Sequence, residues 1–314
     1  MTLDEERALA AVAHEAIKEM RARRRWKIAF RIVMILLVLL YVAAIATRGF
    51  KRETLPKGDF VAMVRVNGVI SADDYANAED VNQALGKAFA AKGVKAVFVD
   101  INSPGGSPVQ SGKIYREIMR LKQEHKVPAY AFINDMGASG AYYVAAAADK
   151  IYADPSSVVG SIGVISQGMG YGDLLDKLGL QNRTYKAGEH KDFLNGAKPE
   201  DPQELAHMQG LLDNLHQQFI TAVKTGRGER LQDNPDLFSG LFWSGEQALA
   251  LGLVDALDDM TVVLKSEFKN AEVVDYTAAR SMWEEVLRHT AMQSKASLRQ
   301  IGGVGEQVEA ILRK

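Results

Sequence analysis

The chain contains no cysteine. This absence excludes disulfide bonds, cysteine nucleophiles and thiolate metal sites, and it leaves the redox compartment of the protein undetermined. An excess of charge of one sign is also missing, because 38 Lys and Arg residues oppose 39 Asp and Glu residues. Such a balance does not indicate that the whole protein binds nucleic acid. No repeat of fixed period is visible, and 314 residues, of which 47% are hydrophobic, have an ordinary globular composition.

One long apolar run lies near the N-terminus. The stretch from Ile32 to Ala46 carries no charge, and residues 28–47 contain only Arg31 as a charged side chain. About 20 residues of helix cross the hydrocarbon core of a bilayer, and an arginine near one end can extend to the interface. We therefore predict an uncleaved transmembrane anchor over residues 28–47.

Two alternatives compete with the anchor. The triplet Ala44-Ile45-Ala46 favours a cleaved signal peptide, and the shortness of the uncharged run favours a buried core helix. The polar stretch before the run is long for a signal peptide, and a flanking basic cluster is unusual for a core helix. The basic cluster consists of Arg21, Arg23, Arg24, Arg25 and Lys27, and it places residues 1–27 in the cytoplasm, where the pattern over residues 2–20 predicts an amphipathic helix. The rest of the chain is then periplasmic or otherwise extracytoplasmic, at the cytoplasmic (inner) membrane.

The remainder of the sequence indicates a linker over residues 48–59 and then one α/β domain over residues 60–280. Runs rich in Val, Ile, Phe and Tyr predict strands over Phe60 to Ile70, Ala96 to Ile101, Ala129 to Ile133 and Lys150 to Ala153. Helical spacing predicts helices over Asp80 to Ala91, Val109 to His125 and Gly140 to Ala148. Residues 281–314 form a C-terminal tail with a helical apolar stripe.

Three glycine-bearing turns follow predicted strands. They are Asn102 to Ser107, Gly137 to Gly140 and Gly160 to Gly163. Turns at the carboxyl ends of strands in an α/β sheet can converge on one crevice. The pair Gly105-Gly106 lets a backbone N–H approach an oxygen closely, as an oxyanion hole requires. Taken singly, each turn is also compatible with an ordinary loop.

Ser139 lies in the second of these turns, between an extended apolar run and an alanine-rich helix. A serine at a turn that opens a helix presents its hydroxyl outward, near backbone N–H groups that favour negative charge. Ser139 is therefore a candidate nucleophile, and the structural alternative is a helix N-cap. Because Ala141 stands where a second glycine is needed, the string is not the Gly-x-Ser-x-Gly elbow of the α/β-hydrolases. Its activator need not be a histidine.

The base that activates Ser139 can be a histidine or a lysine. Five histidines follow the apolar run: His125, His190, His207, His216 and His289. We interpret His125, His207 and His216 as surface residues of helices. Lys191 can serve instead if burial in a dry pocket lowers its pKa from about 10.4 toward 7. It is otherwise a surface lysine paired with Glu189 or Asp192.

The motifs together resemble a known family. The run GASGAYYVAAAADKIYADPSSVVGSIGVI, with NSPGGSP before it and YKAGEHKD after it, is similar to the signal peptide peptidase A (SppA) family of membrane-anchored serine proteases. The resemblance covers about residues 60–258. It implies a Clp protease/crotonase fold of repeated ββα units, preceded by one transmembrane helix. It also implies a Ser-Lys dyad of Ser139 and Lys191, because Lys186 and Lys198 do not fit the family's string.

The resemblance implies the remaining parts of the site as well. Ser161 would hold the lysine in place, and Gly106, with Gly140, would donate N–H groups to the oxyanion. No metal or organic cofactor is expected. The implied protein is a membrane-bound serine endopeptidase that degrades cleaved signal peptides and other membrane-associated peptides through an acyl-enzyme. Because family members form rings or bowls, we expect a homo-oligomer in which the tail over residues 281–314 contacts a neighbouring subunit.

Two other function classes are alternatives. A crotonase-type acyl-CoA enzyme uses a similar double-glycine oxyanion hole, but it is normally a soluble chain with acidic catalytic groups. A catalytically silent membrane scaffold is the other. Cleavage of an apolar peptide that depends on Ser139 and Lys191 would separate the peptidase from both.

Overall fold

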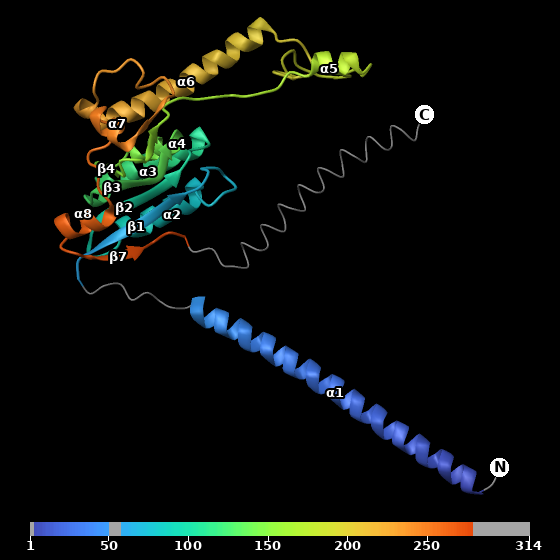
Figure 1. The fold of residues 1–314 in the computed structure, drawn as a ribbon. Coiled ribbons are helices and arrows are strands. Elements are labelled where there is room, and N and C mark those ends of the chain that lie inside the picture. Colours follow the sequence, from blue (N-terminus) through green and yellow to red (C-terminus); the bar gives the residue numbers. More distant parts are fainter. Residues whose placement is uncertain (1–2, 50–57, 279–314) are drawn as a thin grey trace. The chain divides into compact units, whose positions relative to one another are not determined.

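The computed structural model describes residues 3–49 and 58–278 of the chain (Figure 1). The predicted tail over residues 281–314 lies outside the described residues, as do residues 50–57 of the predicted linker. The described residues belong to two separate units. The first contains one long helix, and the second contains a sheet with its covering helices.

The first unit contains the helix α1, Leu3–Gly49, which includes the apolar run. Apolar side chains from Ile32 to Val42 are 45–71% exposed. Among the residues whose placement the structure describes, no helix combines the length and the apolar character needed to cross a bilayer. The anchor predicted over residues 28–47 is thus not shown.

A seven-stranded sheet forms the centre of the second unit. Its strands are β1 Phe60–Asn67, β2 Val94–Ser103, β3 Ala129–Ala138, β4 Lys150–Ala153, β5 Val158–Gly160, β6 Phe242–Ser244 and β7 Glu272–Asp275. Neighbours follow the order β6-β5-β3-β2-β1-β7, and β4 pairs with the first part of β3. All pairs are parallel except β5 with β6. The α/β fold class predicted from the sequence is confirmed.

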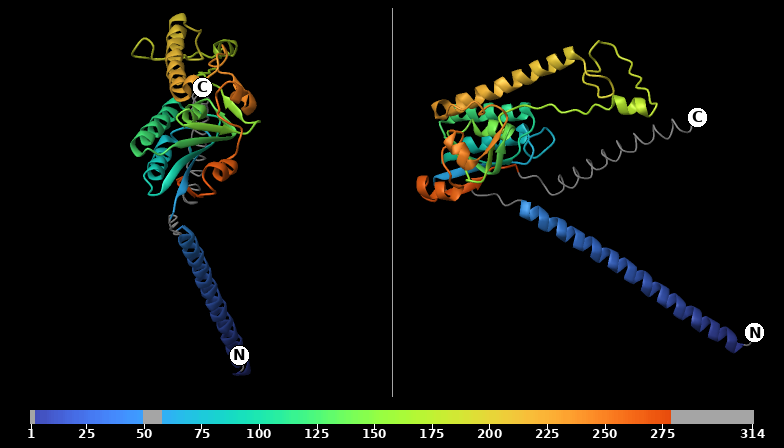
Figure 2. Two further views of the ribbon diagram at one scale, coloured as in Figure 1. Left: turned by 90° about the vertical axis from the view of Figure 1, so that its left-hand side faces the viewer. Right: turned by 45° about the horizontal axis from the view of Figure 1, so that its top comes forward.

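Helices cover both faces of the sheet (Figure 2). The helices of this unit are α2 Ala78–Phe89, α3 Pro108–His125, α4 Gly140–Ala145, α5 Gly172–Lys177, α6 Pro202–Arg227, α7 Gly245–Ala250 and α8 Met260–Glu267, with a short 3-10 turn η1 Gly228–Arg230. α2, α3 and α4 pack on one face, where Leu85 and Ile118 belong to the larger buried core. α8 packs on the other face, where Val263 meets Phe98. A parallel sheet needs this double cover because both faces of its strands are apolar.

The elements predicted up to residue 153 are confirmed. The four predicted strands correspond to β1 through β4, and the three predicted helices correspond to α2, α3 and α4. Ile70 lies beyond the end of β1 and forms an isolated bridge with Gly106. This bridge ties the first strand to the double-glycine turn.

A buried arginine holds the end of α6 to the sheet. Arg227 is 1% exposed, and its Nε donates to the carbonyl of Gly252 at 2.9 Å. Its Nη atoms donate to the two carboxylate oxygens of Asp255 at 2.7 and 3.0 Å. Asp255 also accepts the N–H of Ile151 in β4 at 2.7 Å. A buried guanidinium is tolerated only when its donors are bonded in this way, so the contact fixes the C-terminal end of α6.

Candidate active site

Three turns meet at the carboxyl ends of the parallel strands. β2 leads into the turn at residues 104–107, β3 leads into Ser139, and β5 ends at Gly160. The N–H of Ser139 donates to the carbonyl of Gly160 at 2.8 Å. A Cβ placed on Gly105 would lie only 2.6 Å from the backbone N of Gly140. The predicted convergence of the three glycine-bearing turns is therefore confirmed.

Ser139 has a strained backbone. Its φ of 52° and ψ of −126° lie where non-glycine residues are rare, and such conformations cost of order 1–3 kcal/mol. Its carbonyl accepts the N–H of Tyr143 at 3.0 Å, which starts α4, but its side chain makes no capping hydrogen bond. Ser139 therefore stands at the N-cap position of α4, as the alternative interpretation had it, but its hydroxyl does not cap the helix. The strain instead leaves a half-buried hydroxyl free in a cavity.

Two backbone N–H groups, of Gly106 and Gly140, lie beside each other next to Ser139. A Cβ on Gly140 would be 3.2 Å from the N of Gly106, and neither N–H finds an acceptor in the described part of the chain. Side chains are excluded at both positions: a Cβ on Gly106 would lie 2.2 Å from the carbonyl O of Ile70, and one on Gly140 would lie 2.3 Å from Oγ of Ser111. Free donors next to a serine fit the predicted oxyanion hole.

Gly106→Ala is expected to lower kcat for peptide cleavage by about 10²- to 10³-fold, because the methyl group pushes the turn away from Ile70 and moves the N–H. The same clash should lower the free energy of unfolding in a urea titration. Gly68→Ala is the matched control. Gly68 also has a positive φ, 79°, but open space around it, so its variant should lose about 1 kcal/mol and keep its kcat. An unchanged kcat in folded Gly106→Ala would contradict the oxyanion role.

A cavity of about 270 Å³ opens beside Ser139. Side chains of α3, α4, α6 and the segment after β5 line it together with the glycine turns. Much of this lining is apolar, with Val109, Ile165, Leu215 and Phe219 among its members. Pockets of this kind accept apolar groups and use a few polar groups for orientation.

Ser161 lies next to the Ser139 turn but outside the cavity lining. Its φ is 50°, and its N–H donates to the carbonyl of Leu241 at 2.8 Å. His216 of α6 bonds through Nε2 to the carbonyl of Ile162 at 2.9 Å. The surface position predicted for His216 is wrong, because the ring is half-buried and holds the turn after β5. The role of Ser161 toward a lysine stays a prediction.

Lys191 lies in the exposed segment between α5 and α6 and does not line the cavity that holds Ser139. Both Figure 1 and Figure 2 show α5 near the end of α6 that is remote from α4. The structure thus brings together Ser139, Gly106 and Gly140, with Ser161 next to them. It does not bring Lys191 to them within one chain, and its role as general base stays a prediction.

Ionic contacts distinguish the three lysines of this segment. Lys186 Nζ bonds to Oδ1 of Asp192 at 2.5 Å, and Lys198 Nζ bonds to Oε1 of Glu204 at 2.7 Å. The hydrogen bond to Glu204 raises the pKa of Lys198, which is opposite to what a general base needs. Lys191 has no ion-pair partner among the described residues. Its pairing with a neighbouring carboxylate, the alternative drawn from the sequence, is not observed.

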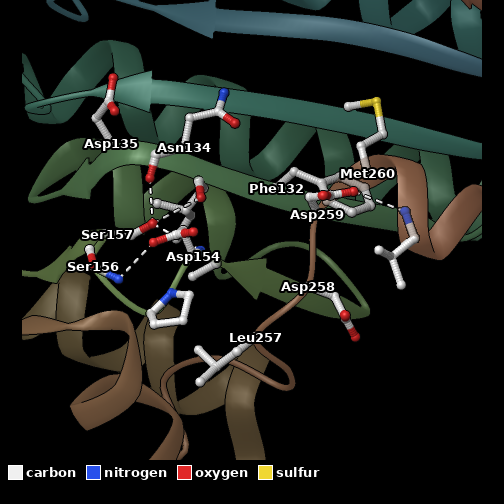
Figure 3. A pocket seen from close by; sticks show the side chains of 14 residues that line it. Phe132, Asn134, Asp135, Asp154, Ser156, Ser157, Leu257, Asp258, Asp259 and Met260 are labelled. Atoms are coloured by element: carbon white, nitrogen blue, oxygen red, sulfur yellow. Dashed lines mark hydrogen bonds between the residues drawn. The ribbon is translucent and has the colours of Figure 1, made fainter.

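A second cavity, of about 560 Å³, lies between the ends of β3 and β4 and the segment before α8 (Figure 3). Four aspartates line it: Asp135, Asp154, Asp258 and Asp259. The hydroxyl of Ser157 is already bonded to the carbonyls of Ile133 and Asn134, so it is unsuited as a nucleophile. Within residues 3–49 and 58–278, no group of three or more His, Asp or Glu is placed to hold a metal ion.

Sequence reasoning missed Arg116, which lines the Ser139 cavity from α3. Tyr143 of α4 lines the cavity as well, and its ring stacks on that of Tyr115 with the centroids 5.2 Å apart. The available signal was helical spacing, because Val109, Gly112 and Arg116 lie at intervals of three and four after the double-glycine turn and therefore share one face.

Similar proteins are found over most of this domain. The peptidase family S49 matches residues 121–274. The putative signal peptide peptidase SppA of Enterococcus faecium is 33% identical over 252 residues, which are 74% of this chain and 73% of that protein. The putative protease slr0021 of Synechocystis is 35% identical over 208 residues, 66% of this chain and 72% of that protein.

A third relative carries a different name. The Na(+)/H(+) antiporter NhaA of Brucella melitensis biotype 1 is 44% identical over 213 residues, or 66% of this chain. The matched part spans only 29% of the length of that relative. The two peptidase relatives, by contrast, are matched over most of their length, and the S49 match contains Ser139, Ser161 and Lys191. The resemblance inferred from the motifs is confirmed, and the chain belongs to peptidase family S49.

Proposed function

We propose that the chain is a serine endopeptidase that cleaves peptides through an acyl-enzyme on Ser139. The observation that carries the proposal is the Ser139 turn, where a strained and uncapped serine lines an apolar cavity beside the N–H groups of Gly106 and Gly140. Membership of peptidase family S49 supports the same chemistry. We propose with it the Clp protease/crotonase type of fold, which fits a parallel sheet with a double-glycine turn after β2.

In the proposed mechanism, the neutral amine of Lys191 takes the hydroxyl proton of Ser139 while Ser139 Oγ attacks the substrate carbonyl carbon. The N–H groups of Gly106 and Gly140 bind the tetrahedral oxyanion. As the C–N bond breaks, Lys191 gives the proton to the leaving amine, and the acyl group stays on Ser139. The same amine then takes a proton from a water molecule as the water oxygen attacks the ester carbon. When the bond from that carbon to Oγ breaks, Lys191 returns the proton to Ser139 Oγ and the acid product leaves. The hydroxyl of Ser161 holds the amine in place.

Lys191 reaches Ser139, in this proposal, from a neighbouring copy within a homo-oligomer. The segment that carries Lys191 exposes large apolar side chains, with Met169 at 81%, Leu178 at 63% and Tyr185 at 92%. Gathered apolar exposure of this kind marks a protein–protein interface. A covering copy would also provide the dry surroundings that lower the pKa of a lysine.

For substrates, we propose cleaved signal peptides and other membrane-associated peptides. The apolar cavity supports this choice, as does the name of the Enterococcus faecium relative, a putative signal peptide peptidase. We also propose that residues 28–47 anchor the chain in the cytoplasmic membrane, with residues 1–27 in the cytoplasm and the catalytic domain outside it. The basic cluster before the apolar run supports this orientation. Release of the full chain from membranes by an alkaline wash would overturn the anchor.

The full chain tests the proposed activity. We expect it to cleave an apolar fluorogenic peptide, and we expect a fluorophosphonate probe to label Ser139, as located by mass spectrometry. Turnover of an acyl-CoA thioester in place of the peptide would instead favour a crotonase-type enzyme. If the chain shows no turnover of either substrate and Ser139 is not labelled, the result favours the catalytically silent scaffold.

A further inference from the structure

Two adjoining cavities lie between α3 and α6, and both are lined by Arg116, Tyr143 and Gln218. The first is the cavity of about 270 Å³ that holds Ser139, and the second has a volume of about 570 Å³. The second continues along the two helices as far as Thr225. Together they offer an extended peptide a path that starts at the nucleophile.

Arg116 is the one charged residue that lines either cavity within the described residues. It makes no ion pair or hydrogen bond with another described residue, whereas Arg120, one turn further along α3, pairs with both Glu117 and Glu124. The guanidinium lies over Gly112, where a Cβ would be 3.1 Å from Nη1. Its donors are therefore free in a cleft that has no carboxylate of its own.

Tyr143 lies next to this guanidinium. The Cβ position on Gly112 that is 3.1 Å from Arg116 Nη1 is also 3.7 Å from the hydroxyl oxygen of Tyr143. Burial raises the pKa of Tyr143, and the positive charge of Arg116 opposes that rise, which places the two groups in electrostatic contact. A guanidinium and a phenol thus offer hydrogen-bond donors at one place in the cleft.

We propose that Arg116 is a specificity residue that binds a carboxylate of the peptide substrate in the cleft beside Ser139. This inference rests on the peptidase function proposed above. A planar guanidinium can bond both oxygens of a carboxylate, and such charge-assisted pairs are about twice as strong as neutral hydrogen bonds. The carboxylate belongs either to an Asp or Glu side chain near the scissile bond or to the free C-terminus of a short peptide. The substrate class is then an apolar peptide with one negative charge near the cleavage site.

Matched fluorogenic peptides test this assignment on the full chain. In the first kind of pair, one peptide has Glu and its twin has Gln at the same position next to the scissile bond, and each such position is tested in turn. In the second kind of pair, one peptide ends in a free carboxylate and its twin ends in a carboxamide. We expect kcat/KM of the wild type to favour the carboxylate member of one pair by about tenfold or more. Arg116→Ala should lose this preference by slowing the acidic peptide and leaving its neutral twin unchanged. Arg116→Glu should prefer a peptide with Lys in place of Glu. The pair whose preference is lost in Arg116→Ala shows whether the carboxylate is that of a side chain or that of the C-terminus.

Arg120→Ala is the control, because it removes a cation from the same helix outside both cavities. Its ratio of kcat/KM for the acidic peptide to kcat/KM for the neutral peptide should equal that of the wild type. Arg116→Gln, checked by its circular dichroism melt, replaces Arg116→Ala if that variant fails to fold. Equal rates on acidic and neutral peptides by an active wild type would overturn the role of Arg116 and leave the peptidase standing. Absence of any cleavage and of Ser139 labelling would overturn the peptidase itself.

Discussion

Ser139→Gly is expected to abolish peptide cleavage and at the same time to raise the free energy of unfolding. The loss of the nucleophile should lower kcat by about 10⁴-fold or more. Stability should rise by about 1 kcal/mol, because glycine adopts a positive φ without the steric cost that Ser139 bears at φ 52°. Urea unfolding of the full chain, followed by circular dichroism, measures the stability change.

Ser139→Ala is the companion variant that separates a nucleophile from a helix cap. Alanine removes the hydroxyl and keeps the Cβ, so the strain persists and no capping bond is lost. Its activity should therefore fall as far as that of Ser139→Gly while its stability stays within about 0.5 kcal/mol of the wild type. A capping serine would behave in the opposite way, losing about 1 kcal/mol as alanine and only a few tenths as glycine. Loss of stability in both variants would refute the strained-nucleophile interpretation.

Local sequence patterns predicted the part of the fold that positions Ser139. The apolar runs of β1 to β4 are buried on both faces of a parallel sheet, so their composition alone marks them as strands. The turns after β2 and β3 carry their conformation in their own residues, since a Cβ on Gly105 or Gly106 would meet backbone atoms below 3.0 Å. Motifs with such local steric causes can be recognised without a structure.

The edge of the sheet and the cavity depend on contacts that are distant in sequence. β6 is only three residues long, Phe242–Ser244, and it pairs antiparallel with β5 some 80 residues earlier. No pattern within three residues marks such a strand. The same holds for the half-buried position of His216, which depends on the carbonyl of Ile162. The same limit applies to the proposed role of Lys191, because its segment contacts α6, where Leu194 N–H donates to Glu204, and does not line the cavity that holds Ser139.

Co-expression of Ser139→Ala and Lys191→Ala chains is expected to restore activity that neither variant has alone. Lys191→Ala should lower kcat by about 10²- to 10⁴-fold, the usual contribution of a general base. If each site combines the serine of one copy with the lysine of the next, random assembly of the two variants leaves about one quarter of the sites intact. Two different affinity tags isolate the mixed oligomers, and peptide cleavage by them gives the measurement.

The recovered fraction decides where the base comes from, because a dyad formed within one chain gives no intact site in any mixture of these two variants. Lys186→Ala paired with Ser139→Ala is the control, since Lys186 bonds to Asp192 and is not proposed as the base. Lys186→Ala should be active by itself. The activity of its mixture with Ser139→Ala should be proportional to the fraction of copies that keep Ser139. If the purified mixed oligomers are no more active than either single variant, the proposal that a neighbouring copy provides Lys191 is wrong. In that case the exposed segment around Tyr185 must close over the cavity of its own chain, and the apolar side chains that it exposes would then cover Ser139 from within.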